Sequence, residues 1–311
     1  MQEMQDRLIS DMKVLGIRDP TSIFYEYVLP DNNLMRFLYE RHNRYGKSDN
    51  SQAAGGRKVR KMDYKFEDHN FVLFELTSDV GFDISIKRQN NIASPEFCLH
   101  IMIDRGSELA YIHNISYYID CAEPELLNPG GGGVLLRLCL KYLKENHKRY
   151  KIKRIQLTDT SLLNCKPHKI NVYLSMLHTL VYGDTWYGKY GFRPYDPDKN
   201  SVNSNLLRLY KKNKQIVRNT AVRHTTLYTH LYPALKKLNP DTSGREFDKI
   251  FDKLKDKTQD LTIGSFFKVF LANFDAKCGI FQEFYLDFAT ENGIYDFHGK
   301  TFYLDIDDIL R

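Results

Sequence analysis

The sequence predicts an α+β protein built on a mixed β-sheet, and three observations support that prediction. Apolar and polar residues alternate through much of residues 69–119, which is typical of half-buried strands. The spacing becomes helical from residue 133, and a short strand pattern follows near residue 152. After about residue 213, apolar residues recur mostly at helical intervals. We therefore expect an antiparallel meander that carries a βαβ crossover, flanked by N- and C-terminal helical regions.

The strands and helices of the middle segment follow from local patterns. Strands are expected at residues 71–76, 82–86, 97–103 and 109–119, separated by short turns. A helix is expected over residues 133–147, because apolar residues recur at i, i+3, i+4 and i+7 from Leu135. The remaining expected elements are a strand at 152–157, a helix at 170–181, a strand near Phe192, a strand at 206–210 and a last strand at 301–305.

The chain divides into three predicted segments. Residues 1–68 are predicted to form short helices followed by a linker at 46–61, which is rich in Gly and Ser. The linker ends in a basic cluster at 57–61 that could contact phosphate, although a solvated loop is the simpler interpretation. Residues 69–212 form the mixed α/β segment, and residues 213–311 are predicted to form a mostly helical C-terminal domain.

Composition excludes several classes of protein. Hydrophobic residues make up 42% of the 311 residues. Burial of that much apolar surface can offset the conformational entropy lost on folding, so the chain is not expected to be wholly disordered. It has no apolar run of about 18 residues and no signal-peptide pattern, so neither a membrane span nor secretion is expected. Five scattered cysteines fit a reducing compartment. The cysteines and the lack of a secretion signal favour a cytoplasmic protein. The net charge of +6 is modest and does not by itself indicate a nucleic-acid partner, so binding of nucleic acid by the basic cluster at 57–61 is the weaker alternative.

The most informative segment is a glycine run, Gly130–Gly133, which follows Asn128-Pro129 and precedes Val134. It lies between the longest predicted strand and the strongest predicted helix. Glycines let backbone N–H groups approach a ligand closely, and a helix N-terminus adds free donors and a positive dipole end. The run therefore predicts a pyrophosphate cradle. Arg137 begins a basic stripe on the same helix, which could meet further phosphates or could be the solvated face.

Two motifs in order carry a resemblance to a known family. The glycine run is the first, and Tyr187-Gly188-Lys189-Tyr190-Gly191-Phe192 is the second. In this arrangement, over about residues 69–212, the chain resembles the GNAT superfamily of N-acetyltransferases. The resemblance implies a GNAT-like mixed sheet and acetyl-CoA as co-substrate. The cofactor-binding residues that it implies are Asn128, Gly130, Gly131, Gly132, Gly133, Val134 and Arg137, with Asn128 standing where the family has Gln or Arg.

The resemblance also implies a reaction. In the family, a substrate amine attacks the acetyl thioester directly, and the enzyme supplies proximity, a base and an acid. By match to the second motif, Tyr187 would protonate the leaving thiolate, since a phenol with a pKa near 10 can share that proton. Tyr190 is the next candidate for the acid. The alternative for Tyr187 is a packing role beside Trp186.

The general base is predicted less directly. His113 lies in the fourth predicted strand and can titrate near neutral pH, but its alternation also fits a packed core histidine. Asp159 follows the fifth predicted strand and could equally cap a helix. Glu108 and Asp184 remain open as bases. One Cys and one His at Cys165 to His168 do not make a zinc site, so no metal is expected.

The sequence therefore predicts two alternative functions. The first is an acetyl-CoA-dependent N-acetyltransferase that acts on an unidentified primary amine. The alternative is a catalytically inactive GNAT-fold protein that serves as a structural or protein-interaction component, with a protein partner bound through the C-terminal helices. The chain also resembles acetyltransferase-like proteins of large DNA viruses, which would place it in the host cytoplasm or the virion.

Overall fold

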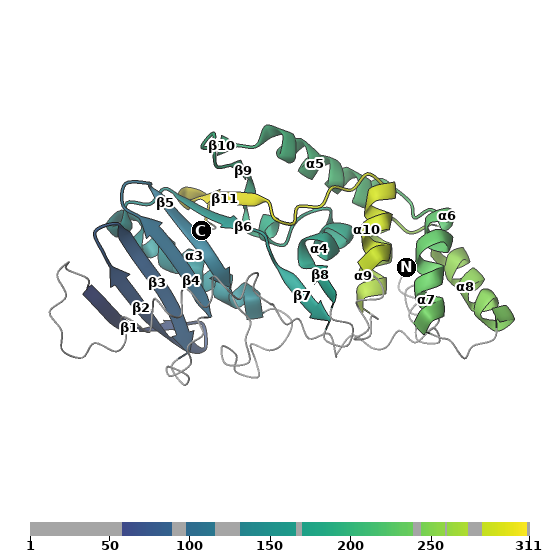
Figure 1. Ribbon diagram of the computed structural model, residues 1–311, viewed down its shortest axis with the longest axis horizontal. Helices are drawn as coiled ribbons and strands as arrows, with labels where there is room; N and C mark the ends of the chain where they lie inside the picture. The colour runs from purple at the N-terminus through teal and green to yellow at the C-terminus, as the bar shows by residue number, and fades with distance from the viewer. Residues whose placement is uncertain are drawn as a thin grey trace. The chain divides into compact units, whose positions relative to one another are not determined.

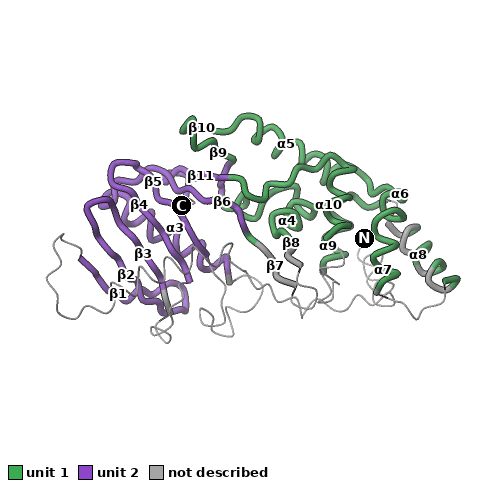
Figure 2. Tube along the Cα trace, viewed as in Figure 1, with its two compact units in different colours: residues 1–24, 161–190, 194–300 green, residues 25–160, 191–193, 301–311 purple. Residues whose placement is uncertain are grey.

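The computed structural model describes residues 58–88, 98–115, 131–165, 170–238, 244–258, 260–272 and 282–309. The helices predicted within residues 1–45 lie outside these ranges. The chain forms two compact units (Figure 2). Unit 1 comprises residues 1–24, 161–190 and 194–300, and unit 2 comprises residues 25–160, 191–193 and 301–311. In the described residues, no helix combines the length and the apolar character that a membrane crossing requires.

Unit 2 contains the predicted meander (Figure 1). Its strands are β1 (Lys58–Phe66), β2 (His69–Thr77), β3 (Gly81–Arg88), β4 (Leu99–Asp104) and β5 (Leu109–Ile115). Each pairs antiparallel with the next, which confirms the prediction. The linker expected at 46–61 is wrong from Lys58 onward. Residues 58–66 pair with β2 along their whole length. The composition of residues 58–61 alone does not indicate this pairing, because strand formation depends on the neighbouring strand.

A βαβ crossover follows the meander, as predicted. Helix α3 (Gly131–Tyr150) leads to β6 (Arg154–Thr158), and β6 pairs parallel with β5 from Leu109↔Arg154 to Ile112↔Leu157. The sheet is therefore mixed. Helix α3 contacts β4 and β5, and the sheet residues on that face form the core of the unit. Fully buried members of this core include Ile84, Ile101, Leu136, Leu143 and Ile155.

The last strand of unit 2 comes from the end of the chain. Strand β11 (Thr301–Asp305) pairs antiparallel with β6, so the described strands of this unit lie in the order β1-β2-β3-β4-β5-β6-β11. A strand at 301–305 was expected from the sequence and is confirmed. Its place beside β6 was not foreseen, and the compact units consequently cut across the three segments predicted from the sequence. A 3-10 turn, Ile306–Asp308, follows β11.

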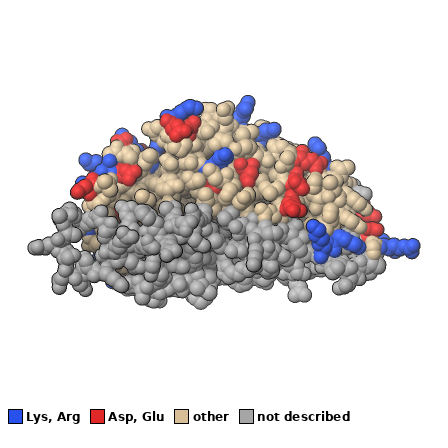
Figure 3. Space-filling view, in the orientation of Figure 1, with Lys and Arg blue, Asp and Glu red and all other residues tan. Residues whose placement is uncertain are grey.

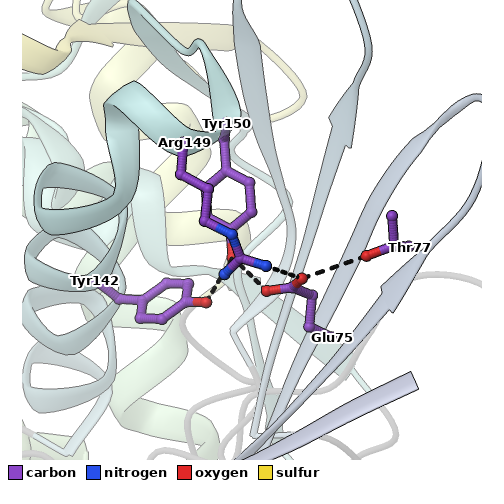
Figure 4. Close-up of polar contacts among 5 residues, drawn as sticks. All are labelled: Glu75, Thr77, Tyr142, Arg149 and Tyr150. Atoms are coloured by element: carbon purple, nitrogen blue, oxygen red, sulfur yellow. Dashed lines mark hydrogen bonds and ion pairs between the residues drawn. The ribbon is translucent and has the colours of Figure 1, made fainter. Parts of the chain in front are cut away.

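A buried carboxylate anchors the C-terminal end of α3 to the sheet (Figure 4). Glu75 on β2 is 1% exposed and forms an ion pair with Arg149. Its Oε2 accepts a hydrogen bond from Tyr150 OH at 2.6 Å, and its Oε1 accepts one from Thr77 at 3.3 Å. The hydroxyl of Tyr142 lies 2.6 Å from that of Tyr150. Burial raises the pKa of both phenols, so both stay protonated and neither adds a negative charge beside Glu75.

Unit 1 is mainly helical, as the spacing after residue 213 indicated. It starts with a hairpin of β7 (Leu162–Cys165) and β8 (Ile170–Tyr173), followed by α4 (Leu174–Tyr182), a 3-10 helix at Tyr187–Tyr190, and β9 (Arg193–Asp196) paired with β10 (Ser201–Val202). The later helices are α5 (Ser204–Asn219), α6 (His224–Thr226), a π-helical turn (Leu227–Leu231), α7 (Tyr232–Leu238), α8 (Gly244–Thr258), α9 (Ile263–Ala272) and α10 (Gln282–Glu291). Packed aromatic rings of α9 and α10 form its core: Phe266, Phe267, Phe270, Phe284, Tyr285 and Phe288.

Two sequence-based elements of unit 1 need correction. The strand expected at 206–210 is wrong, because these residues lie within α5. The side chain of Asn203 accepts a hydrogen bond from the Leu206 N–H at 3.0 Å, which caps the helix. The helix expected at 170–181 begins only at Leu174, because residues 170–173 pair with β7. The strand expected near Phe192 is present as β9.

Asn213 joins α5 to the segment after α10, and its removal is expected to destabilise unit 1. Its buried amide donates to Tyr295 O at 2.8 Å and accepts from Tyr295 N at 2.9 Å. Asn213→Ala leaves both backbone groups without these partners, so the free energy of unfolding should fall by about 2 kcal/mol. Denaturant unfolding measures the change. The exposed Gln215→Ala on the same helix is the control, and equal stability of the two variants would contradict the prediction.

Candidate functional site

The parallel strands β5 and β6 stop pairing before either strand ends. Their last pair is Ile112↔Leu157, while β5 continues to Ile115 and β6 to Thr158. In α/β crossovers, ligands bind at the carboxyl ends of the strands, where the chains separate. The described residues therefore place a candidate site at the carboxyl ends of β5 and β6.

The start of α3 belongs to the same end of the crossover. Just after the helix, Lys153 N donates to Glu108 O at 2.8 Å, so the C-terminal end of α3 lies at the beginning of β5. The helix has 20 residues and is about 30 Å long at 1.5 Å per residue. Its N-terminus must then lie toward the carboxyl end of β5. This is where the sequence placed the glycine run.

The described part of the glycine run forms the first turn of α3. The helix begins at Gly131, Gly132 and Gly133 are buried, and Val134 is half-buried. Asn128 and Gly130 lie outside the described residues. The first turn contains no acidic side chain, so its free N–H groups and the positive end of the dipole face no local negative charge from the helix itself. That chemistry suits an anion.

Two members of the basic stripe of α3, Arg137 and Lys144, are bonded to protein groups. Arg137 makes a bidentate ion pair with Glu67 in the β1–β2 turn, with Nη2–Oε1 at 2.9 Å and Nε–Oε1 at 3.1 Å. Lys144 Nζ donates to the backbone oxygen of Ile306 at 2.7 Å. Because a bidentate fork satisfies a guanidinium group well, Arg137 is committed to the β1–β2 turn in this structure.

His113 lies on β5 just beyond the end of the parallel pairing, and it is half-buried. Its ring is 5.5 Å from that of His100, at 90°. Burial lowers the pKa of His113, the neighbouring His100 lowers it further, and Asp83 raises it. The lowered pKa keeps the imidazole neutral near pH 7, which is the form that accepts a proton.

Asp159 directly follows β6 and is fully buried. The helix-cap interpretation of this residue is wrong, since the next element is the strand β7 and not a helix. Among the other base candidates, Glu108 pairs with Lys153 at 2.8 Å. In unit 1, Asp184 pairs with Lys214 at 2.6 Å and accepts a hydrogen bond from Tyr210. Ion pairs therefore engage Glu108 and Asp184.

Tyr187 belongs to unit 1, whereas α3, His113 and Asp159 belong to unit 2. The tyrosine begins the 3-10 helix Tyr187–Tyr190, is 9% exposed, and packs edge-on against Trp186 at 4.9 Å. The structure thus groups His113 and Asp159 with the start of α3 in one unit and assigns the predicted acid to the other. Tyr190 also contacts the Trp186 ring, at 5.3 Å.

Sequence reasoning missed the pair formed by Asp83 on β3 and His100 on β4. The His100 Nε2 atom lies 2.5 Å from Asp83 Oδ1. Asp83 lies between Phe82 and Ile84, and His100 lies between Leu99 and Ile101. This alternation of polar and apolar residues was a usable signal. Their contact depends on strand register, which a single sequence does not specify.

Comparisons of the chain with protein-family models, with curated proteins and with solved structures found no match. Within the described ranges, no group of three or more His, Cys, Asp or Glu side chains could hold a metal ion. On the face drawn in Figure 3, basic and acidic side chains are interspersed over the described surface.

Proposed function

We propose that this protein is an acetyl-CoA-dependent N-acetyltransferase that acts on a primary amine by direct attack. One observation carries the proposal. The parallel strands β5 and β6 stop pairing at Ile112↔Leu157, and the helix that connects them starts with consecutive glycines. Separated strands beside a glycine-lined helix N-terminus suit a ligand that has an anionic end and a narrow reactive arm.

Each described group has a definite part in this proposal. The free N–H groups at the start of α3 bind the pyrophosphate of acetyl-CoA, and the absence of side chains on Gly131, Gly132 and Gly133 allows close approach. His113, at the end of β5, accepts the proton of the attacking amine. Tyr187 belongs to unit 1, so its motif-implied role as the acid stays a prediction, and water protonates the leaving thiolate. Arg137 is left out of the phosphate site because Glu67 holds its guanidinium group.

An inactive structural protein with this fold is the second candidate, and two observations favour it. Tyr187 is only 9% exposed, and Asp159 is fully buried, so neither is freely presented to a substrate. A partner would then bind another surface, such as the helices of unit 1. This candidate predicts a folded protein that does not bind acetyl-CoA.

Titration calorimetry with acetyl-CoA distinguishes the two candidates. The wild-type chain is expected to bind in the micromolar range, which corresponds to roughly −8 kcal/mol. Gly131→Glu places a carboxylate at the N-terminus of α3, so binding should weaken at least tenfold by charge repulsion and steric block. Gly131→Ala is the matched control and should bind within a few-fold of the wild type. Arg137→Ala should also retain binding. A folded wild-type protein that shows no heat of binding would overturn the enzyme proposal.

A further inference from the structure

Three polar side chains from adjacent strands form a row across the sheet of unit 2: Asp83 on β3, His100 on β4 and His113 on β5. The neighbouring residues Ile84, Ile101 and Ile112 are 0–4% exposed and belong to the core. In a strand, successive side chains point to opposite faces. The row therefore lies on the opposite face of the sheet from the core that α3 covers.

The contacts along the row are specific. His100 Nε2 and Asp83 Oδ1 are 2.5 Å apart, and the His100 side chain is 7% exposed while that of Asp83 is 40% exposed. The His100 ring then meets the His113 ring at 5.5 Å and 90°. A carboxylate bound to one ring nitrogen fixes the tautomer and the orientation of a histidine. Asp83 thus holds His100, and His100 packs against His113.

A β-bulge lies at this point of the sheet. The register between β4 and β5 pairs His100 with Asn114 and Ile101 with Ile112, so His113 is the extra residue on β5. The parallel ladder to β6 has also ended at Ile112. Bulges bend a strand and change the direction of a side chain, and they are frequent beside active sites. The fold therefore singles out His113 on β5 independently of its titration.

We propose that Asp83 and His100 are positioning residues for His113, which acts as the proton acceptor in amine acetylation. This inference rests on the proposed function. The amine lone pair attacks the thioester carbon, the C–S bond breaks, and the amine proton passes to the imidazole of His113. The thiolate takes a proton from water. Asp83 and His100 hold the imidazole in place and set its charge, and they do not touch the reacting atoms.

The electrostatics of the row make this testable. Among the described residues, the charged or titratable groups found beside His113 are His100 from β4, Asp83 from β3 and Tyr111 from its own strand. His100 lowers the pKa of His113 and Asp83 raises it. Asp83→Asn should consequently lower the pKa of His113, and His100→Gln should raise it. A purely structural row would lose stability on substitution, but it would not produce shifts of opposite sign.

The first experiment is an NMR titration of the histidine ring protons in the full-length protein. The His113 signal is assigned by its loss in His113→Gln. Its midpoint should move in opposite directions in Asp83→Asn and His100→Gln, each by about half a pH unit or more. Asp63→Asn, an exposed carboxylate change on β1, is the control and should leave the midpoint unchanged. If both row variants titrate like the control, the inference is overturned.

The second experiment measures acetyl transfer to a panel of amines: a peptide with a free N-terminus, a lysine peptide, spermidine and glucosamine. Asp83→Asn and His100→Gln should keep the acetyl-CoA affinity, lower kcat about tenfold, and shift the pH profile in the same directions as the NMR midpoints. If the wild type acetylates an amine and His113→Gln is equally active, the row has no catalytic part. If the wild type neither binds acetyl-CoA nor acetylates any amine, the proposed function fails, and the NMR titration still reports on the row.

Discussion

Arg149→Ala is expected to lower the free energy of unfolding of unit 2 by about 3 kcal/mol. The substitution removes the cation that pairs with Glu75, whose side chain is 1% exposed. A buried carboxylate without its partner is costly, because the protein interior does not replace the lost hydration. The expected loss of stability is at the lower end of the losses seen when a buried ion pair is broken. The reason is that the Arg149 side chain is 39% exposed, so water can reach that end of the network.

A double-mutant cycle isolates this interaction. Glu75→Gln removes the charge, keeps an acceptor for Tyr150, and should cost less than Arg149→Ala. The double variant should then be more stable than the sum of the two losses predicts. Denaturant titration measures the free energy of unfolding of each variant. Amide hydrogen exchange in β2 and α3 then shows whether the loss of stability is local to this network. Lys148→Ala, an exposed substitution one residue away, is the control. Additive losses would show that the pair is not coupled.

Gly81→Ala is expected to destabilise the same unit by a similar amount, about 3 kcal/mol. Gly81 is paired with Asp104 across β3 and β4, and a Cβ atom at this position would lie 2.0 Å from the backbone oxygen of Ile103. A backbone atom within a ladder cannot move aside as the end of a side chain can. The β3–β4 pairing must therefore open locally, which also disturbs the strands that carry Asp83 and His100.

Gly106→Ala is the matched control for this prediction. Gly106 has a φ of +87°, but no atom lies within 4 Å of its added Cβ. Gly106→Ala should lower the free energy of unfolding by only about 1 kcal/mol, which is the cost of holding an alanine at a positive φ. Thermal unfolding monitored by near-ultraviolet circular dichroism compares the two variants. Equal melting temperatures would show that backbone contact at Gly81 is not the dominant cost.

The strands of the meander and the helix α3 were predictable because their signals are local. Residues 82–86 carry the period of two, residues 71–76 form a short apolar run, and the residues after Gly131 carry the helical period. Both periods arise because one face of a strand or helix is buried and the other is exposed. A short stretch of sequence is enough to show that pattern. The same patterns placed His113 on a strand and Asp159 after one, and their role as bases stays a prediction.

The errors in the prediction have an equally physical origin. The segment at 206–210 has the apolar residues of a strand, but the cap at Asn203 and the buried face of α5 make it helical. Residues 58–61 of β1 were predicted to end a linker, because they form a basic cluster after a segment rich in Gly and Ser. Its stability comes from the ladder to β2, a property of the pair and not of either segment alone.

The sequence by itself determined the α+β class, the crossover and the position of the glycine run, since these depend on neighbours within a few residues. Only the tertiary structure decided which distant segments meet. It placed β11 against β6, where the Thr158 and Thr301 hydroxyls face each other across 143 residues of chain. It also paired Glu67 with Arg137 and Asp83 with His100. Register and long-range pairing are set by packing between elements, and no local pattern encodes them.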